Sequence, residues 1–178
     1  LLLSVLPTAV FAATEYDLYI NEFQFTSTNL TYTGEVGSAV YSPQTKTLSL
    51  NSLIISTSRT NALIYSNIPG LTINVNGTTT INLLDSSPIG GSDIGQDQTN
   101  HAFMFEADTT VKGQSGNKSI DKIVINSKSI GVTNPEPDGT TRVGISSFAQ
   151  LTLQDITLSM TDNSVTNKVG YASLIRAG

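Results

Sequence analysis

The chain has 178 residues, enough for one domain of ordinary size with a substantial core, and a formal net charge of −5. Charged residues make up only 13% of it, against roughly 25% in globular chains, and its lysines and arginines stand singly, which argues against nucleic acid as a partner. No cysteine is present, so disulfides and thiolate metal sites are excluded. If such a chain is exported, the lack of cysteine indicates a bacterial surface, where a repetitive core must supply the stability.

The first residues are typical of the end of a secretory signal peptide. Residues 1–13 are apolar, too short a run to span a bilayer, and end in small residues. Val10 and Ala12 fit the cleavage motif, so we expect cleavage after Ala12 and assign residues 1–12 to a signal-peptide remnant. Residues 13–178 then form one domain. Because the start of the signal is missing and the strand pattern is still running at the last residue, we expect a truncated piece of a longer secreted or cell-surface protein.

Apolar and polar residues alternate along most of the chain, which is the pattern of a half-buried β-strand. No window shows the apolar spacing of a helix, and the alternating runs are short and bounded by Gly, Asn, Asp or Pro. In chain order these runs lie within residues 16–25, 48–55, 71–75, 123–125, 151–153 and 156–160. The sequence therefore predicts an all-β fold.

One short unit recurs along the chain: a strand, a polar turn and a second strand. Residues 64–66 (IYS) are followed after a short turn by residues 71–73 (LTI). At nearly the same distance, residues 145–147 (ISS) are followed by residues 151–153 (LTL). We assign residues 104–106 (MFE) and 171–173 (YAS) to the first strand of the same unit. A parallel β-helix stacks such strands and tolerates loops of any length between them. We therefore predict a single-stranded right-handed parallel β-helix. A β-sandwich stays open as the alternative, because Asn76-Gly77 and Asp138-Gly139 fit hairpin turns.

Two longer loops, residues 85–100 and 131–142, interrupt these strands, and loops on a rigid scaffold often carry binding sites. The first loop is rich in Gly, Ser and carboxylates, and calcium prefers six to eight oxygen ligands of this kind. The candidate calcium ligands are Asp85, Asp93 and Asp97. Their spacing matches neither an EF-hand nor a nonapeptide calcium repeat, so a solvated acidic loop is the alternative.

The N-terminal half resembles a known family in three segments. Residues 16–27 (YDLYINEFQFTS) look like its opening motif, residues 41–51 (YSPQTKTLSLN) like its second, and the strands between 64 and 81 like its third. The resemblance is to carbohydrate-binding-domain-containing, β-helix-like cell-surface proteins of Gram-positive gut bacteria, some related to a clostridial β-helix that binds polygalacturonate. It covers residues 16–83 and implies a β-helix and carbohydrate binding, without assigning a ligand residue. Tyr19 replaces the family's Trp, and Ser42 its Asp.

No motif of a catalytic centre is present. The lone His101 cannot build a zinc site, and the serines lie in neither a nucleophile elbow nor a phosphate loop. Ser66, Ser147 and Ser173 share a position in the repeat, which predicts a hydrogen-bonded ladder rather than nucleophiles. No arginine is next to a cluster of carboxylates, as a polysaccharide lyase would need. We expect a protein that is not an enzyme.

Two aromatic residues are the candidate ligand-binding residues. Tyr65 and Phe105 each follow an apolar neighbour that we predict to point inward, so alternation places both rings on the outer face. Exposed rings on a rigid sheet can stack on sugars, whereas packing under a loop is the alternative role. We therefore expect a non-catalytic polysaccharide-binding module on a bacterial surface, with no cofactor other than the candidate calcium. A stalk or adhesin segment without a glycan ligand and a polysaccharide lyase relative are the alternatives.

Overall fold

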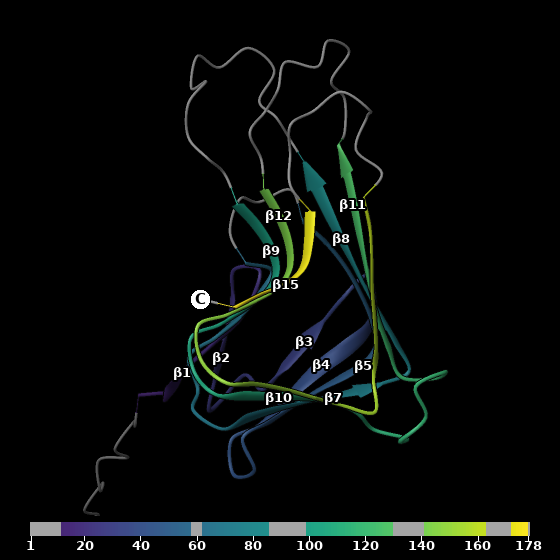
Figure 1. Cartoon of the computed structure of the whole chain (residues 1–178). Helices are drawn as coiled ribbons and strands as arrows, with labels where there is room; N and C mark the ends of the chain where they lie inside the picture. Colours follow the sequence, from purple (N-terminus) through teal and green to yellow (C-terminus); the bar gives the residue numbers. More distant parts are fainter. Residues whose placement is uncertain (1–11, 58–61, 86–98, 130–140, 163–171, 178) are drawn as a thin grey trace, which may run out of the picture.

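The computed structural model describes residues 12–57, 62–85, 99–129, 141–162 and 172–177, and all regular structure in these ranges is β-strand (Figure 1). The strands are β1 (Glu15–Ile20), β2 (Phe23–Thr26), β3 (Thr31–Thr33), β4 (Val36–Ser42), β5 (Thr47–Thr57), β6 (Ile64–Ser66), β7 (Leu71–Asn76), β8 (Thr78–Asp85), β9 (Thr99–Phe105), β10 (Thr109–Gly113), β11 (Lys122–Ser129), β12 (Thr141–Ser147), β13 (Leu151–Gln154), β14 (Thr157–Asp162) and β15 (Ala172–Ala177). The predicted all-β class is confirmed. The described residues contain no helix long and apolar enough to cross a membrane.

The strands form two sheets that curl around a common core. Sheet A has the order β15-β12-β9-β6-β1-β2, and sheet B has the order β13-β10-β7-β5-β8-β11-β14, with β4 paired to β5 and β3 to β4. Strand β5 joins two arms of sheet B, because its first half pairs with β7 and its second half with β8. In Figure 1 sheet A and the two arms of sheet B enclose the core between them.

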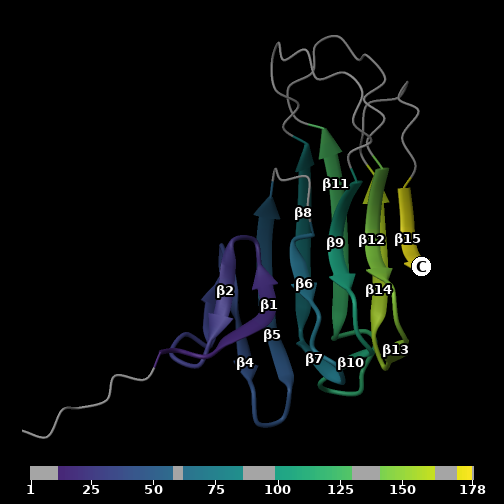
Figure 2. The ribbon, with the colours of Figure 1, turned by 90° about the vertical axis from the view of Figure 1, so that its left-hand side faces the viewer.

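Pairing between repeated strands is parallel. Strands β6, β9, β12 and β15 pair in that order, as do β7, β10 and β13, and also β8, β11 and β14. Each pass of the chain therefore lies against the next, and Figure 2 shows the passes side by side. Antiparallel pairs, which a β-sandwich would use throughout, occur among the described strands only where β1 to β6 meet one another.

The register confirms part of the predicted repeat. Residues 71–73 and 151–153 occupy equivalent positions, because both segments pair with the first three residues of β10. The strands at 64–66 and 145–147 are also equivalent, since Ile64 and Ile145 both pair with Phe103. The two-strand unit inferred from sequence is therefore a repeated piece of the structure.

Two members of the predicted repeat are wrongly placed. Ser66 and Ser147 both pair with Phe105, so the equivalent segment of β9 begins at Phe103 and not at Met104. At the end of the chain Ser147 pairs with Ala177 rather than with Ser173. A shift of one residue turns every side chain of a strand to the opposite face, so the first of these errors reverses the prediction for β9.

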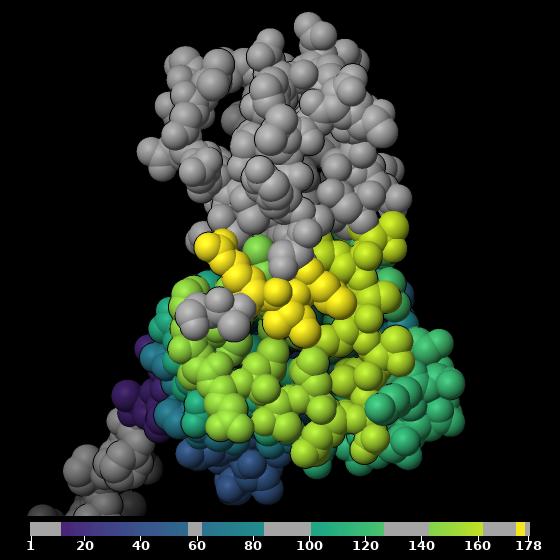
Figure 3. All heavy atoms as spheres, in the orientation of Figure 1, coloured from purple at the N-terminus to yellow at the C-terminus, as the bar shows by residue number. Residues whose placement is uncertain are grey.

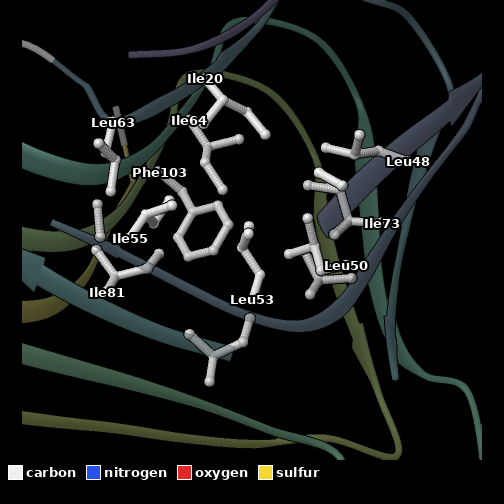
Figure 4. Packing of buried hydrophobic residues seen from close by; sticks show 14 of the residues in the cluster. Ile20, Leu48, Leu50, Leu53, Ile55, Leu63, Ile64, Ile73, Ile81 and Phe103 are labelled. Atoms are coloured by element: carbon white, nitrogen blue, oxygen red, sulfur yellow. The ribbon is translucent and has the colours of Figure 1, made fainter. Parts of the chain in front are cut away.

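The core is a single apolar cluster that draws on sheet A and on both arms of sheet B. Strand β9 contributes Phe103 and Phe105, whose ring centroids lie 5.9 Å apart. Figure 4 shows Phe103 among aliphatic side chains from β1, β5, β6, β7 and β8. At the far end of the stack, Figure 3 shows the surface formed by the last described strands. Strand β13, one of these, contains the half-buried Leu151 and the exposed Leu153.

A sharp corner joins the two arms of sheet B. Gly77 makes the turn between β7 and β8 with a φ of 80°, in the left-handed region that favours glycine, and a Cβ there would lie 2.7 Å from the hydroxyl of Ser52. In the next pass the same corner is a longer loop, residues 114–121, which ends at the buried Asp121. Its carboxylate accepts hydrogen bonds from the N–H of Gly77 (3.0 Å) and from the N–H and hydroxyl of Ser115 (2.6 Å each). One buried acid therefore ties two passes of the chain together.

Candidate functional site

The outer face of sheet A, which faces the viewer in Figure 2, carries a row of large side chains. Tyr19 of β1 pairs with Tyr65 of β6, Tyr65 pairs with Met104 of β9, and Met104 pairs with Ser146 of β12. Tyr19, Tyr65 and Met104 are half-buried. Because paired residues on neighbouring strands share a face, these side chains form a line that crosses the strands.

A second row runs beside the first. Asp17 lies within β1, and the other members of the row lie just past the ends of β6, β9 and β12. Asn67 donates its N–H to the carbonyl of Asp17 (3.0 Å), and Glu106 and Phe148 follow the paired ends of β9 and β12. All four residues are exposed, and the Phe148 side chain is 56% exposed. We call the two rows together the sheet-A strip; it consists of Asp17, Tyr19, Tyr65, Asn67, Met104, Glu106 and Phe148.

The two tyrosines form the centre of the strip. The ring centroids of Tyr19 and Tyr65 lie 5.9 Å apart at an interplanar angle of 59°. This is a tilted arrangement within the distance range that aromatic pairs prefer. The pair exists because β1 and β6 are antiparallel neighbours and both residues point away from the core. Together the rings give sheet A an apolar outer surface with hydroxyl groups at its edge.

Carboxylates surround this pair. The Glu106 carboxylate lies close enough to the Tyr65 hydroxyl to act as its hydrogen-bond acceptor. Burial, this hydrogen bond, and the charges of Asp17 and Glu106 together raise the pKa of Tyr65 from its ordinary value of 10.0 to about 12. The strip therefore combines aromatic rings with negatively charged side chains.

The pKa of Tyr65 gives a direct check on this geometry. In an alkaline titration followed by phenolate absorbance, we expect one tyrosine to ionise near pH 12, and we expect that step to vanish in Tyr65→Phe. Glu106→Gln should lower the midpoint, because a neutral amide no longer repels the phenolate. Asp155→Asn, at an exposed position on a corner of sheet B, is the matched control and should leave the midpoint in place. A Tyr65 midpoint at or below 10 would contradict the arrangement.

The structure places the two candidate aromatic residues on opposite sides of sheet A. Tyr65 points outward, as alternation predicted. The same prediction for Phe105 is wrong: its side chain is fully buried and packs against Phe103. Met104 is the outward residue of this part of β9, because it, not Phe105, pairs with Tyr65. Phe105 is a core residue and takes no part in the strip.

The candidate calcium ligands are not brought together by any described contact. Asp85 is the last residue of β8, but its side chain, together with Asp93 and Asp97, lies outside the described residues. In the described ranges, no three His, Asp or Glu side chains gather closely enough to hold a metal ion. Calcium binding in this loop stays a prediction.

The predicted serine ladder is wrong. Phe105 lies between Ser66 and Ser147 in the sheet, so these hydroxyls do not stack. Each instead stabilises the turn after its own strand: the Ser66 hydroxyl accepts the N–H of Ile68 (3.1 Å), and the Ser147 hydroxyl donates to the carbonyl of Ala149 (2.9 Å). Short polar side chains favour such local bonds at turns.

A polar ladder does exist on the outer face of the β8 arm. Asn82 donates its side-chain amide to the hydroxyl of Ser56 (3.1 Å), and Asn126 donates to the amide oxygen of Asn82 (3.0 Å). These three residues pair across β5, β8 and β11. Sequence analysis missed the ladder because its members are 26 and 44 residues apart.

His101 has no catalytic partner in the described part of the chain. Its Nδ1 is buried and lacks a hydrogen-bond partner there. Burial, and secondarily the positive charge of Arg176, lower the pKa of His101, so the imidazole is neutral at pH 7. Within sheet A His101 pairs with Val143 of β12.

Sequence analysis also missed most of the strip around Tyr65. The alternation in residues 15–20 does place Asp17 and Tyr19 on the face opposite Leu18, which was a usable signal. That this face adjoins Tyr65 depends on the antiparallel pairing of β1 with β6, which the sequence does not specify. Glu106 and Phe148 join them through parallel pairing across gaps of about forty residues, which loop-length variation hides from a repeat search.

Comparison with protein-family models, curated proteins and solved structures finds no match to this chain. The functional argument therefore rests on the sheet-A strip itself.

Proposed function

We propose that this chain is a non-catalytic, extracellular carbohydrate-binding module of a bacterial surface protein, and that the sheet-A strip is its glycan-binding site. The observation that carries the proposal is the outward Tyr19–Tyr65 pair with hydrogen-bonding groups beside it. Aromatic rings offer apolar faces on which the C–H faces of sugars can stack. Asp17, Asn67 and Glu106 offer acceptors, and Asn67 also donors, for sugar hydroxyls.

The dimensions of the strip favour a polymer over a single sugar. From Tyr19 on β1 to Phe148 beyond β12 the strip crosses three strand spacings, or roughly 14 Å at about 4.8 Å per spacing. Apolar side chains recur along this line, at Tyr65 and Met104 between its two ends. A glycan chain lying across the strands would meet them in turn. The proposed ligand is therefore a polysaccharide.

The proposal includes a scaffold and a location. We propose that the passes of the chain form a right-handed parallel β-helix of the kind found in the surface proteins that residues 16–83 resemble. The three parallel strand sets support this, because each is one side of such a coil. The signal peptide at residues 1–12 and calcium binding at Asp85, Asp93 and Asp97 belong to the same proposal.

Binding to a panel of immobilised bacterial and plant polysaccharides tests this function. We expect at least one to bind, and we expect Tyr65→Ala to weaken that binding at least tenfold, a loss of about 1.4 kcal/mol. The control is Ile120→Ala, an exposed apolar side chain on the corner loop of sheet B, which should bind as the wild type does. Removing calcium with a chelator tests the loop proposal in the same assay.

Two results would contradict the proposal. If the folded chain binds no polysaccharide with or without calcium, the result favours a structural stalk or adhesin segment without a glycan ligand. If it releases unsaturated sugars from pectin, the chain is a lyase and not a binding module.

A further inference from the structure

The charged side chains of the strip are carboxylates, and no described lysine or arginine side chain forms an ion pair with them. Asp17 and Glu106 are exposed on the second row, and both raise the pKa of Tyr65 through their charge. Neither forms an ion pair with a described side chain. The Lys46 ammonium, at the turn before β5, instead donates to the carbonyl of Pro69 (3.0 Å).

Arg176, the basic residue of sheet A whose side chain is described, is too distant to neutralise the charges of Asp17 and Glu106. Arg176 lies in the row of Tyr65, but on β15, after Met104 on β9 and Ser146 on β12. Three strand spacings, or roughly 14 Å, separate it from Tyr65. That is longer than the Debye length of about 8 Å at physiological ionic strength. A ligand on the tyrosine pair therefore meets two carboxylates and little compensating positive charge.

We infer that the glycan bound by the sheet-A strip carries free amino groups, so that its class is a cationic amino-sugar polymer. The inference rests on the proposed carbohydrate-binding function. An ammonium group placed over Tyr19 and Tyr65 gains a cation–π interaction with the ring faces. The same group next to Glu106 or Asp17 gains a charge-assisted hydrogen bond.

The same groups select against other glycans. A uronic-acid polymer would place its carboxylates beside those of Asp17 and Glu106, and like charges brought together without a counter-ion repel. A neutral or N-acetylated polymer keeps the stacking but gains no ion pair. The order of affinity should be amino-sugar polymer, then acetylated polymer, then uronic-acid polymer.

The test compares three soluble oligosaccharides of equal length: fully deacetylated glucosamine hexamer, N-acetylglucosamine hexamer and galacturonic-acid hexamer. Calorimetric titration at about pH 5.5 keeps the amines of the deacetylated hexamer protonated. At low salt we expect the deacetylated hexamer to bind about tenfold more tightly than the acetylated one. Because exposed ion pairs are screened, this ratio should fall as salt is added.

The double variant Asp17→Asn/Glu106→Gln assigns the preference to its source. It removes both charges while retaining the shapes of the side chains, so the ratio of affinities for the deacetylated and acetylated hexamers should fall to about one. Each single variant should lower the ratio several-fold. Asp155→Asn removes one charge elsewhere on the surface, so it controls for net charge and should preserve the ratio.

The binding results distinguish failure of the amino-sugar inference from failure of the proposed carbohydrate-binding function. If none of the hexamers binds and the polysaccharide panel is also negative, the proposed function itself fails. If the acetylated or galacturonic-acid hexamer binds as well as the deacetylated one, the module binds glycans but the amino-sugar inference is overturned. Unchanged preference in the double variant overturns it as well. Equal binding of an oligolysine peptide would identify a cationic peptide as the partner in place of a glycan.

Discussion

Replacing Asp121 with asparagine is expected to lower the free energy of unfolding by about 3 kcal/mol. The carboxylate is fully buried and accepts three hydrogen bonds, from the N–H of Gly77 and from the N–H and hydroxyl of Ser115. Asparagine keeps the shape but replaces one acceptor oxygen with a donor, which then faces another donor. A buried donor left without a partner costs roughly 1–3 kcal/mol, and hydrogen bonds to a charged group exceed neutral ones.

Equilibrium urea unfolding, followed by far-UV circular dichroism because the chain has no tryptophan, measures this loss. The control is Asp155→Asn at the corresponding corner of the following pass. Asp155 is exposed and has a φ of 47°, which asparagine also adopts readily, so its replacement should change stability by less than about 0.5 kcal/mol. Equal effects of the two variants would show that Asp121 does not tie the passes together.

The same carboxylate makes stability depend on pH at the acid end. Burial alone would raise the pKa of Asp121, but the hydrogen bonds from the Ser115 hydroxyl and from the N–H groups of Gly77 and Ser115 outweigh it, and the pKa is lowered from its ordinary value of 3.8. A carboxyl whose folded pKa lies below its unfolded value contributes stability that is fully present above the unfolded pKa. This contribution is lost as pH falls through the folded pKa. The stability difference between wild type and Asp121→Asn should therefore shrink below pH 3.8.

Local sequence predicted the strands and many of their inward positions. Leu71, Ile73 and Val75 alternate with polar residues and are all fully buried, and Ile123 and Ile125 behave in the same way. A period of two is a direct consequence of strand geometry, so it can be read without knowing the partner strands. The all-β class followed from this property alone.

Pairing between strands could not be read in the same way. Strand β5 is one continuous run, residues 47–57, yet it pairs with β7 along one half and with β8 along the other. The bend falls at Ser52, a non-glycine residue with a φ of 45°. No turn motif in the sequence predicts a bend at this position. Such a corner is held by contacts with later passes of the chain, including Gly77 against Ser52.

The same limit explains why the predicted orientation was right for Tyr65 and wrong for Phe105. Tyr65 lies between two buried residues in a three-residue strand, so its outward orientation follows from alternation. Residues 102–105 (AFMF) are all apolar, so hydrophobicity alone does not say which of them face the core. Their orientation is set by the register against β6, in which Phe103 pairs with Ile64. A contact between distant segments therefore decided the role of Phe105.

Phe105→Ala is expected to destabilise the chain by about 3–5 kcal/mol, the range for removing a buried phenylalanine ring from a core. Phe105 is fully buried and packs against Phe103, so truncation leaves a cavity that the rigid strands of sheet A cannot close. Phe105→Leu leaves a smaller cavity and should cost less. The measurement is again urea unfolding of the full chain.

Phe148→Ala provides the matched comparison, because this ring lies in the sheet-A strip and is 56% exposed. It should cost less than about 1 kcal/mol of stability and should instead weaken glycan binding, since more than half of the side chain stays exposed to water in the folded chain. If Phe105→Ala left the stability unchanged and weakened glycan binding instead, Phe105 would face outward and the register of β9 would be shifted by one residue. Because alternation makes the two registers opposite at every position of β9, the Phe105→Ala variant decides between them with no further structural data.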